Sequence, residues 1–212
     1  MKQKPIIICL QIVLALAICG LGYVVYRQIA APIEFQHELN NRRKAVITRL
    51  KSIRTAEQLF KMNNNRFTAD WDTLTNFALY DSIVMERKKY DEDDSVQMAK
   101  LAKTKEKNIE YFKVAVKDSL HISDDDIKNM RYIPFTDDTE VFSLSAGTLT
   151  TESKVVVPVV ECSALYIKFL DTVKYRQDIV NFLDEEKQFN REPFIKFGSM
   201  ETANNEAGNW ED

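Results

Sequence analysis

The sequence predicts an α+β protein in which an N-terminal transmembrane helix continues into a long amphipathic helix packed on a small antiparallel sheet. Three observations carry this prediction. Residues 5–26 contain no charged side chain, although Asp, Glu, Lys and Arg make up 29% of the 212 residues. Residues 33–62 carry apolar side chains at helical spacing, and residues 111–170 contain short alternating segments that precede a last helical stretch.

The apolar run is long enough to cross a bilayer. It covers the 22 residues from Pro5 to Tyr26, with Gln11 as its only strongly polar member. At about 1.5 Å per residue it spans roughly the 30 Å of a hydrocarbon core. A cleaved signal peptide and a lipoprotein signal at Cys19 are the alternatives. Because signal-peptide cores are shorter, about 7 to 15 residues, the length favours a retained anchor.

Two sets of residues in this segment are candidates for function. Small side chains would let a second membrane helix approach closely, and they stand at Ala15, Ala17, Gly20 and Gly22. Side chains suited to the membrane–water interface follow at Tyr23, Tyr26 and Arg27. The sequence therefore predicts the lipid bilayer as one partner and lateral helix association as a second contact.

Charge predicts the topology. The net charge of −3 divides into +3 for the first 30 residues and −6 for the remaining 182. Lys2 and Lys4 form a short basic tail, which favours the cytoplasm. We expect a cytoplasmic tail at 1–4, a transmembrane helix at 5–30, a periplasmic domain at 31–200 and a polar C-terminal tail at 201–212. The expected location is the inner membrane, and the acidic body excludes nucleic acid as a partner.

A second helix is expected from about Ile33 to Met62, after an interruption at Pro32. Its apolar stripe steps by four, three, four and three residues, which places one face of the helix inward except at its single acidic member. The stripe consists of Val46, Leu50, Ile53, Glu57 and Phe60. We expect the four apolar members to pack on the sheet and the basic side chains around them to stay free for a partner.

The remaining elements follow from caps, alternation and turn residues. Thr68 or Asp70 would cap a short helix over 70–79, and residues 90–108 read as an exposed loop or solvated helix. Gly147 would mark a turn and Pro158 an edge strand or bulge. Strands are expected at 83–88, 111–116, 141–144, 155–160 and 194–197, with an extension at 165–170, and further helices at 123–130 and 172–190.

The sequence contains no recognisable catalytic or cofactor motif. The soluble part has three separate glycines, at Gly147, Gly198 and Gly208, so the glycine-rich loops that bind nucleotides are absent. The two histidines do not stand at zinc spacing with cysteine. The acidic clusters at 124–126 and 137–140 more often cap helices than bind Ca²⁺. We therefore expect no cofactor and no nucleotide.

Residues 49–74 resemble the first-helix region of type IV pilins and type II secretion pseudopilins. Asn65, Arg66 and Phe67 match the Asn/Gly-Arg-Tyr/Phe turn with which that helix ends, and Ala56-Glu57 match the helix end. The resemblance implies a pilin-like domain, with a long helix leading through a loop to an antiparallel sheet. The prepilin cleavage pattern is missing, because no Glu stands in residues 5–26. The whole chain also resembles single-pass envelope proteins of Bacteroidota.

These observations predict a non-enzymatic, inner-membrane-anchored structural or adaptor subunit of a cell-envelope machine of the secretion, pilus-like or energy-transducing kind. Its partners would be other membrane or envelope proteins, a second copy of the chain included. The alternative is a membrane-anchored periplasmic ligand-binding or sensor module. An envelope enzyme is the third reading, and no catalytic set of residues favours it.

Overall fold

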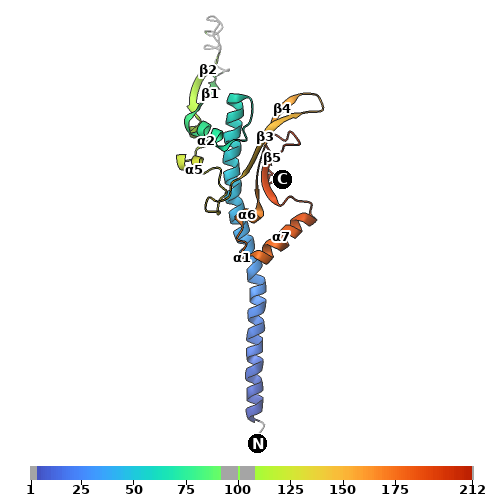
Figure 1. The fold of residues 1–212 in the computed structure, drawn as a ribbon. Coiled ribbons are helices and arrows are strands. Elements are labelled where there is room, and N and C mark those ends of the chain that lie inside the picture. Colours follow the sequence, from blue (N-terminus) through green and yellow to red (C-terminus); the bar gives the residue numbers. More distant parts are fainter. Residues whose placement is uncertain (1–3, 92–99, 101–107, 212) are drawn as a thin grey trace.

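The computed structural model describes residues 4–91, 100 and 108–211. One helix, α1 (Lys4–Asn64), runs through the whole molecule over 61 residues. Its N-terminal part stands bare, and the body is gathered around its C-terminal part, with elements on both sides of the helix (Figure 1). The α+β class and the long apolar N-terminal helix are thus confirmed.

The expected interruption at Pro32 was wrong, because α1 passes through this residue without a break. A proline lacks the N–H that would bond to the carbonyl four residues earlier, so the helix loses one hydrogen bond there. The flanking stretches are long and rich in helix formers, and their intact hydrogen bonds keep the axis continuous. The apolar N-terminal segment and the body are therefore joined by helix rather than by a hinge.

One side of α1 carries a small unit of short elements. Asp70 caps the first of its helices by accepting a hydrogen bond from the Thr73 N–H, so the choice between Thr68 and Asp70 falls on Asp70. The two strands pair antiparallel, with Ile83 opposite Val114. Most of the charged segment expected as a loop or solvated helix, 92–99 and 101–107, lies outside the described residues. The elements are α2 (Trp71–Tyr80), β1 (Ser82–Arg87), β2 (Glu110–Ala115), α4 (Val116–Leu120) and α5 (Asp124–Lys128).

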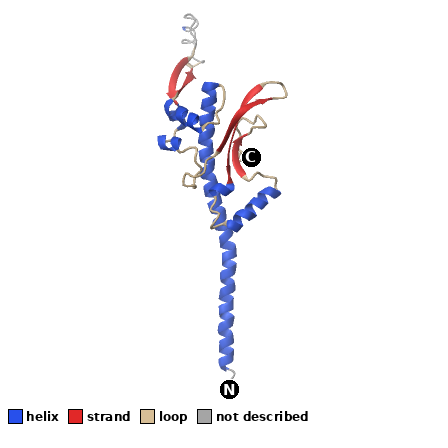
Figure 2. Ribbon diagram, viewed as in Figure 1, coloured by secondary structure: helices blue, strands red, loops and turns tan. Residues whose placement is uncertain are grey.

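The other side carries a three-stranded antiparallel sheet with the order β3-β4-β5 (Figure 2). Its strands are β3 (Ser143–Thr150), β4 (Val156–Leu165) and β5 (Phe194–Gly198). Gly147 lies inside β3, paired with Val159, and not in a turn as expected. The turn falls later, where the Thr151 N–H donates to the Val155 carbonyl over 2.9 Å. Pro158 pairs with β3 beyond the stretch that β5 covers, as expected of a proline at a local edge.

Two helices complete this side. Residues expected to extend the strand form α6 (Tyr166–Phe169) instead, and α7 (Arg176–Gln188) follows as expected. Tyr175 and Ile179 are buried at the start of α7, whereas Phe189, which directly follows the helix, is 62% exposed. The helix inclines away from α1 toward its C-terminus (Figure 1).

A single core joins both sides across α1. Leu50 and Ile53 of α1 are fully buried and belong to the same cluster as Leu74 of α2, Phe169 of α6 and Phe197 of β5. Burial of one such side chain contributes about 1.5–3 kcal/mol. The helix is therefore the central wall of the core and not a stalk beside it.

Gly198 provides a test of this packing. Its φ is +74°, and a Cβ there would lie 1.9 Å from the Val160 carbonyl oxygen of the neighbouring strand. We expect Gly198→Ala to lower the free energy of unfolding by more than about 2 kcal/mol. The measurement is urea unfolding of the full chain in detergent, followed by tryptophan fluorescence.

Gly147→Ala is the matched control, because its Cβ would meet only the flexible end of Met200 at 3.0 Å. Its effect should stay within about 1 kcal/mol. Equal effects of the two substitutions would contradict the close strand contact at Gly198.

Candidate functional site

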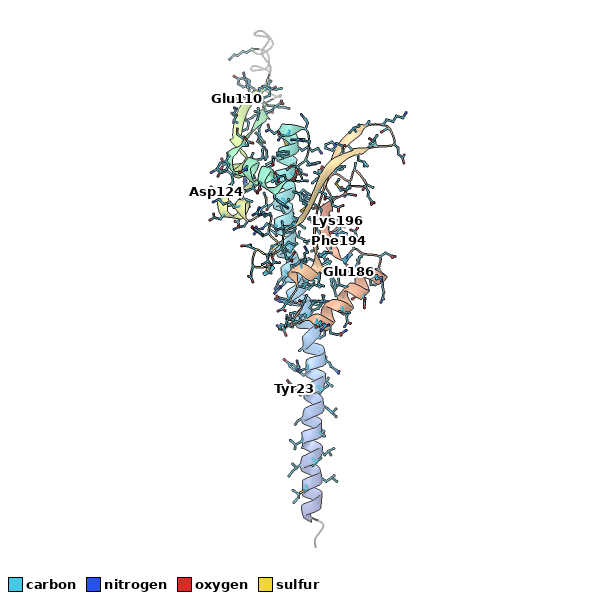
Figure 3. The ribbon with its side chains drawn as sticks, viewed as in Figure 1. Tyr23, Glu110, Asp124, Glu186, Phe194 and Lys196 are labelled. Atoms are coloured by element: carbon cyan, nitrogen blue, oxygen red, sulfur yellow. The ribbon has the colours of Figure 1, made fainter. Side chains whose placement is uncertain are left out.

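The described part of the apolar N-terminal segment stands apart from the body (Figure 1). One helix in the described part of the chain is long and apolar enough to span a membrane, and none of its most apolar window is buried. Tyr23 is 63% exposed, and its side chain projects from the bare part of α1 (Figure 3). The other residues predicted for helix packing and the interface are exposed as well, at Ala15, Ala17, Gly20, Gly22, Tyr26 and Arg27.

The predicted stripe and turn occupy the opposite end of α1. Val46, Leu50, Ile53 and Phe60 are buried against the body. The turn after the helix begins with Asn65 in the left-handed region, at φ 55°, where its N–H donates to the Lys61 carbonyl over 2.8 Å. This is a common helix C-cap that Asn tolerates well.

The next two residues of that turn lie in different environments. Arg66 points to solvent, whereas Phe67 is buried. The Lys61 ammonium stands 4.7 Å from the centre of the Phe67 ring.

Glu57 is the one stripe residue whose placement the sequence did not anticipate. Its side chain is fully buried. One carboxyl oxygen accepts a hydrogen bond from the Thr68 N–H at 3.2 Å, and the other has no partner among the described residues. Burial raises the pKa of Glu57 to about 8, against the smaller opposing effect of the Thr68 bond. Helical spacing places position 57 on the inward face, but a carboxyl group is costly to bury. The sequence therefore predicted that only the four apolar members of the stripe would be inside.

The basic face of α1, expected to be free for a partner, is largely used by the body itself. Arg42 donates to the Phe169 carbonyl at 2.7 Å, and Arg49 donates to the Asn129 carbonyl at 2.7 Å. The expectation was wrong because a helix at the centre of a core meets neighbours on most of its sides. Its long cationic side chains reach the free carbonyls at the ends of those neighbours.

The C-terminal segment binds to the same helix. Arg54 donates to Glu211 at 2.7 Å, and Lys61 pairs with Glu206 at 3.1 Å. Backbone hydrogen bonds also tie the segment to β5, from the Gly198 N–H to the Ala207 carbonyl over 2.9 Å. The sequence predicted a polar tail here, and acidic residues in such a tail are expected to face solvent. No periodic apolar pattern in this segment indicated that it would pack against α1.

This docking closes one side of a polar cavity of about 530 Å³. Its walls come from α1, α6, the end of α7, β5 and the C-terminal segment, and Glu186 and Phe194 lie on this side of the molecule (Figure 3). Two buried nitrogens among the lining residues, Arg43 Nε and Trp210 Nε1, have no hydrogen-bond partner within the described part of the chain. An unsatisfied buried donor costs about 1–3 kcal/mol, so both atoms are unusual for a wall that only supports the fold.

Among the described residues, the side-chain types that serve catalysis or metal binding do not come together. Cys162 is fully buried, where burial raises the pKa of its thiol, whereas His121 lies on the surface against the Asp118 carbonyl. In α5, Ser123 caps the helix by accepting from the Asp126 N–H at 3.1 Å. Among the residues that the structure describes, no three His, Cys, Asp or Glu side chains are grouped to hold a metal ion.

Comparison with protein-family models, with curated proteins and with solved structures finds no match to this chain. The resemblance to pilins therefore stays a prediction, based on residues 49–74 and on the order of the elements.

Glu57 predicts a dependence of stability on pH. Folding raises the pKa of Glu57 from 4.5 to about 8, so the folded state binds this proton more tightly than the unfolded state. The stability that the protonated Glu57 contributes is therefore fully present below pH 4.5 and is lost as the pH rises to 8. We expect Glu57→Gln, which keeps an acceptor for the Thr68 N–H without the charge, to be more stable than the natural chain by up to about 3 kcal/mol at pH 7. Urea unfolding of both proteins at pH 5, 6, 7 and 8 measures the difference.

Glu110→Gln is the control, because a hydrogen bond from Arg87 lowers the pKa of this exposed carboxyl. Its effect should not change between pH 5 and 8. The same pH slope in the natural chain and in Glu57→Gln would disprove a neutral buried Glu57.

Proposed function

We propose that this protein is a non-enzymatic, single-pass inner-membrane subunit whose periplasmic body serves as a structural or adaptor part of a cell-envelope complex. One observation carries the proposal: the bare apolar segment and the central wall of the core belong to the same helix. A helix without a break transmits the position and rotation of its membrane segment to the body. That property suits a subunit that presents a surface at a defined place.

The short distance between membrane and body supports this role. Phe35, the first buried residue of the core, lies nine residues beyond Tyr26, a rise of about 14 Å. In that interval Glu34 accepts from Lys174 at 2.6 Å and from the Tyr175 hydroxyl at 3.2 Å. The body is thus held close to the end of the apolar run, within reach of other membrane-anchored subunits.

A second role as a ligand-binding or sensor module is favoured by one feature, the cavity that contains the unpartnered Arg43 and Trp210 nitrogens. The two roles are compatible, because a subunit fixed in the membrane can also report on a ligand bound to its body.

Lateral association of the membrane helix tests the subunit role. A Cβ at Gly20 or Gly22 would meet nothing within 4 Å inside the chain, so Gly20→Leu with Gly22→Leu should leave the body folded. We expect this double variant to lose at least about tenfold of its co-purification with membrane partners in mild detergent, because small residues permit close helix contact. Ile12→Leu with Val25→Leu is the control on the same helix, at positions away from both faces that carry the small residues. Equal recovery of partners with both variants would contradict the proposal.

Topology has its own test. Protease added to spheroplasts should degrade residues 31–212, while the same protease should leave them intact in whole cells. Protection of the body in spheroplasts would place it in the cytoplasm and overturn the periplasmic location.

A further inference from the structure

We propose that the cavity between α1, α7, β5 and the C-terminal segment binds a small carboxylate ligand, with Arg43 as the anion-binding group and aromatic side chains holding the apolar part of the ligand. This inference goes beyond the adaptor role and does not depend on it.

The cavity has the size of a small-molecule site and three aromatic residues in its walls. Its volume of about 530 Å³ falls within the 300–1,000 Å³ usual for such sites. Three aromatic residues from separate parts of the chain line it, Tyr166, Phe194 and Trp210. Tyr166 is buried and belongs to the hydrophobic core, so the aromatic wall is continuous with the core and is held in place by it.

Charge in the cavity is balanced except at Arg43. Glu186 is paired with Arg191 at 3.2 Å, and Glu192 is paired with Lys196 at 2.9 Å. Within the described residues Arg43 forms neither an ion pair nor a hydrogen bond, and its Nε is buried without a partner. One guanidinium is therefore left to bind an anion.

The neighbouring groups indicate which anion fits. A guanidinium binds a planar carboxylate through two parallel hydrogen bonds. A single negative charge matches Arg43, the cation of these walls that has no ion pair among the described residues. A phosphate dianion would bring a second negative charge next to Glu186 and Glu192, whose own cations are already paired. The Trp210 N–H, buried without an acceptor, is a second donor for the ligand.

Height above the membrane argues against lipid as the ligand. Arg43 lies 17 residues beyond Tyr26 along an unbroken helix, a rise of about 25 Å. The headgroup layer extends only about 5–8 Å beyond the hydrocarbon core. The carboxylate must therefore come from a soluble molecule or a peptide end in the surrounding compartment.

Benzoate is a suitable probe, with benzamide as its neutral counterpart and phenyl phosphate as its dianionic counterpart. The chain has two tryptophans, Trp71 and Trp210, so Trp71→Phe leaves Trp210, in the cavity wall, as the only tryptophan to be excited selectively. We expect benzoate to change the Trp210 emission of the full chain in detergent saturably, with a Kd in the millimolar range or below. Benzamide and phenyl phosphate should each bind at least about tenfold more weakly.

Arg43→Gln should weaken benzoate binding by about tenfold or more, and Arg43→Lys, which keeps the charge but not the planar fork, should weaken it less. Lys44→Gln removes the same charge from an exposed neighbour and should leave the Kd within about twofold. Thermal unfolding of each variant establishes that it is folded, and Arg43→Lys with Lys44→Gln suffices should Arg43→Gln not fold. Absence of saturable binding, equal binding of benzamide or phenyl phosphate, or equal losses in the Arg43 and Lys44 variants would each overturn the proposal.

Discussion

The structure depends on one constraint, the continuity of α1 through Pro32. A helix cannot bend sharply without losing hydrogen bonds, so the apolar N-terminal end of α1 and its buried end in the body keep a fixed relation. The elements of the body are arranged around that axis on both sides. The apolar stripe of α1 therefore packs against the elements on both sides of the helix. For this reason the fully buried Ile53 belongs to one cluster with Leu74 of α2 and Phe197 of β5.

A central helix also accounts for the polar groups that ended inside. Glu57 lies at the inward position that its spacing dictates, and the protein satisfies one of its oxygens with the Thr68 N–H at the start of the following loop. The carboxyl remains neutral near pH 7 because its pKa is raised to about 8. The same crowding turns Arg42 and Arg49 toward carbonyls at the ends of neighbouring elements.

The C-terminal segment connects the fold to the proposed ligand site. It is held by Arg54 and Lys61 of α1 and by backbone bonds to β5, and in this position Trp210 forms a wall of the cavity. Glu206 and Glu211 of this segment are paired with α1, and the carboxylates of the other wall are paired with Arg191 and Lys196. Among the described residues this pairing leaves Arg43 without a partner, so its unpaired charge follows from the tertiary arrangement of the acids.

The sequence by itself determined the parts that depend on local pattern. Three signals are local: the uncharged run from Pro5 to Tyr26, the helical spacing through Val46 and Phe60, and a helix cap at Thr68 or Asp70. The structure then selects Asp70 as the cap. Only the tertiary structure decided the places of Gly147 and of residues 166–169. Gly147 pairs with Val159 of the neighbouring strand, which overrides its local preference for a turn. Burial of Phe169 in the core favours a short helix over the strand that was expected at 166–169. The cavity was beyond the sequence for the same reason. Arg43, Tyr166 and Trp210 are far apart along the chain, and only long-range packing brings them to one wall and leaves one guanidinium unpaired.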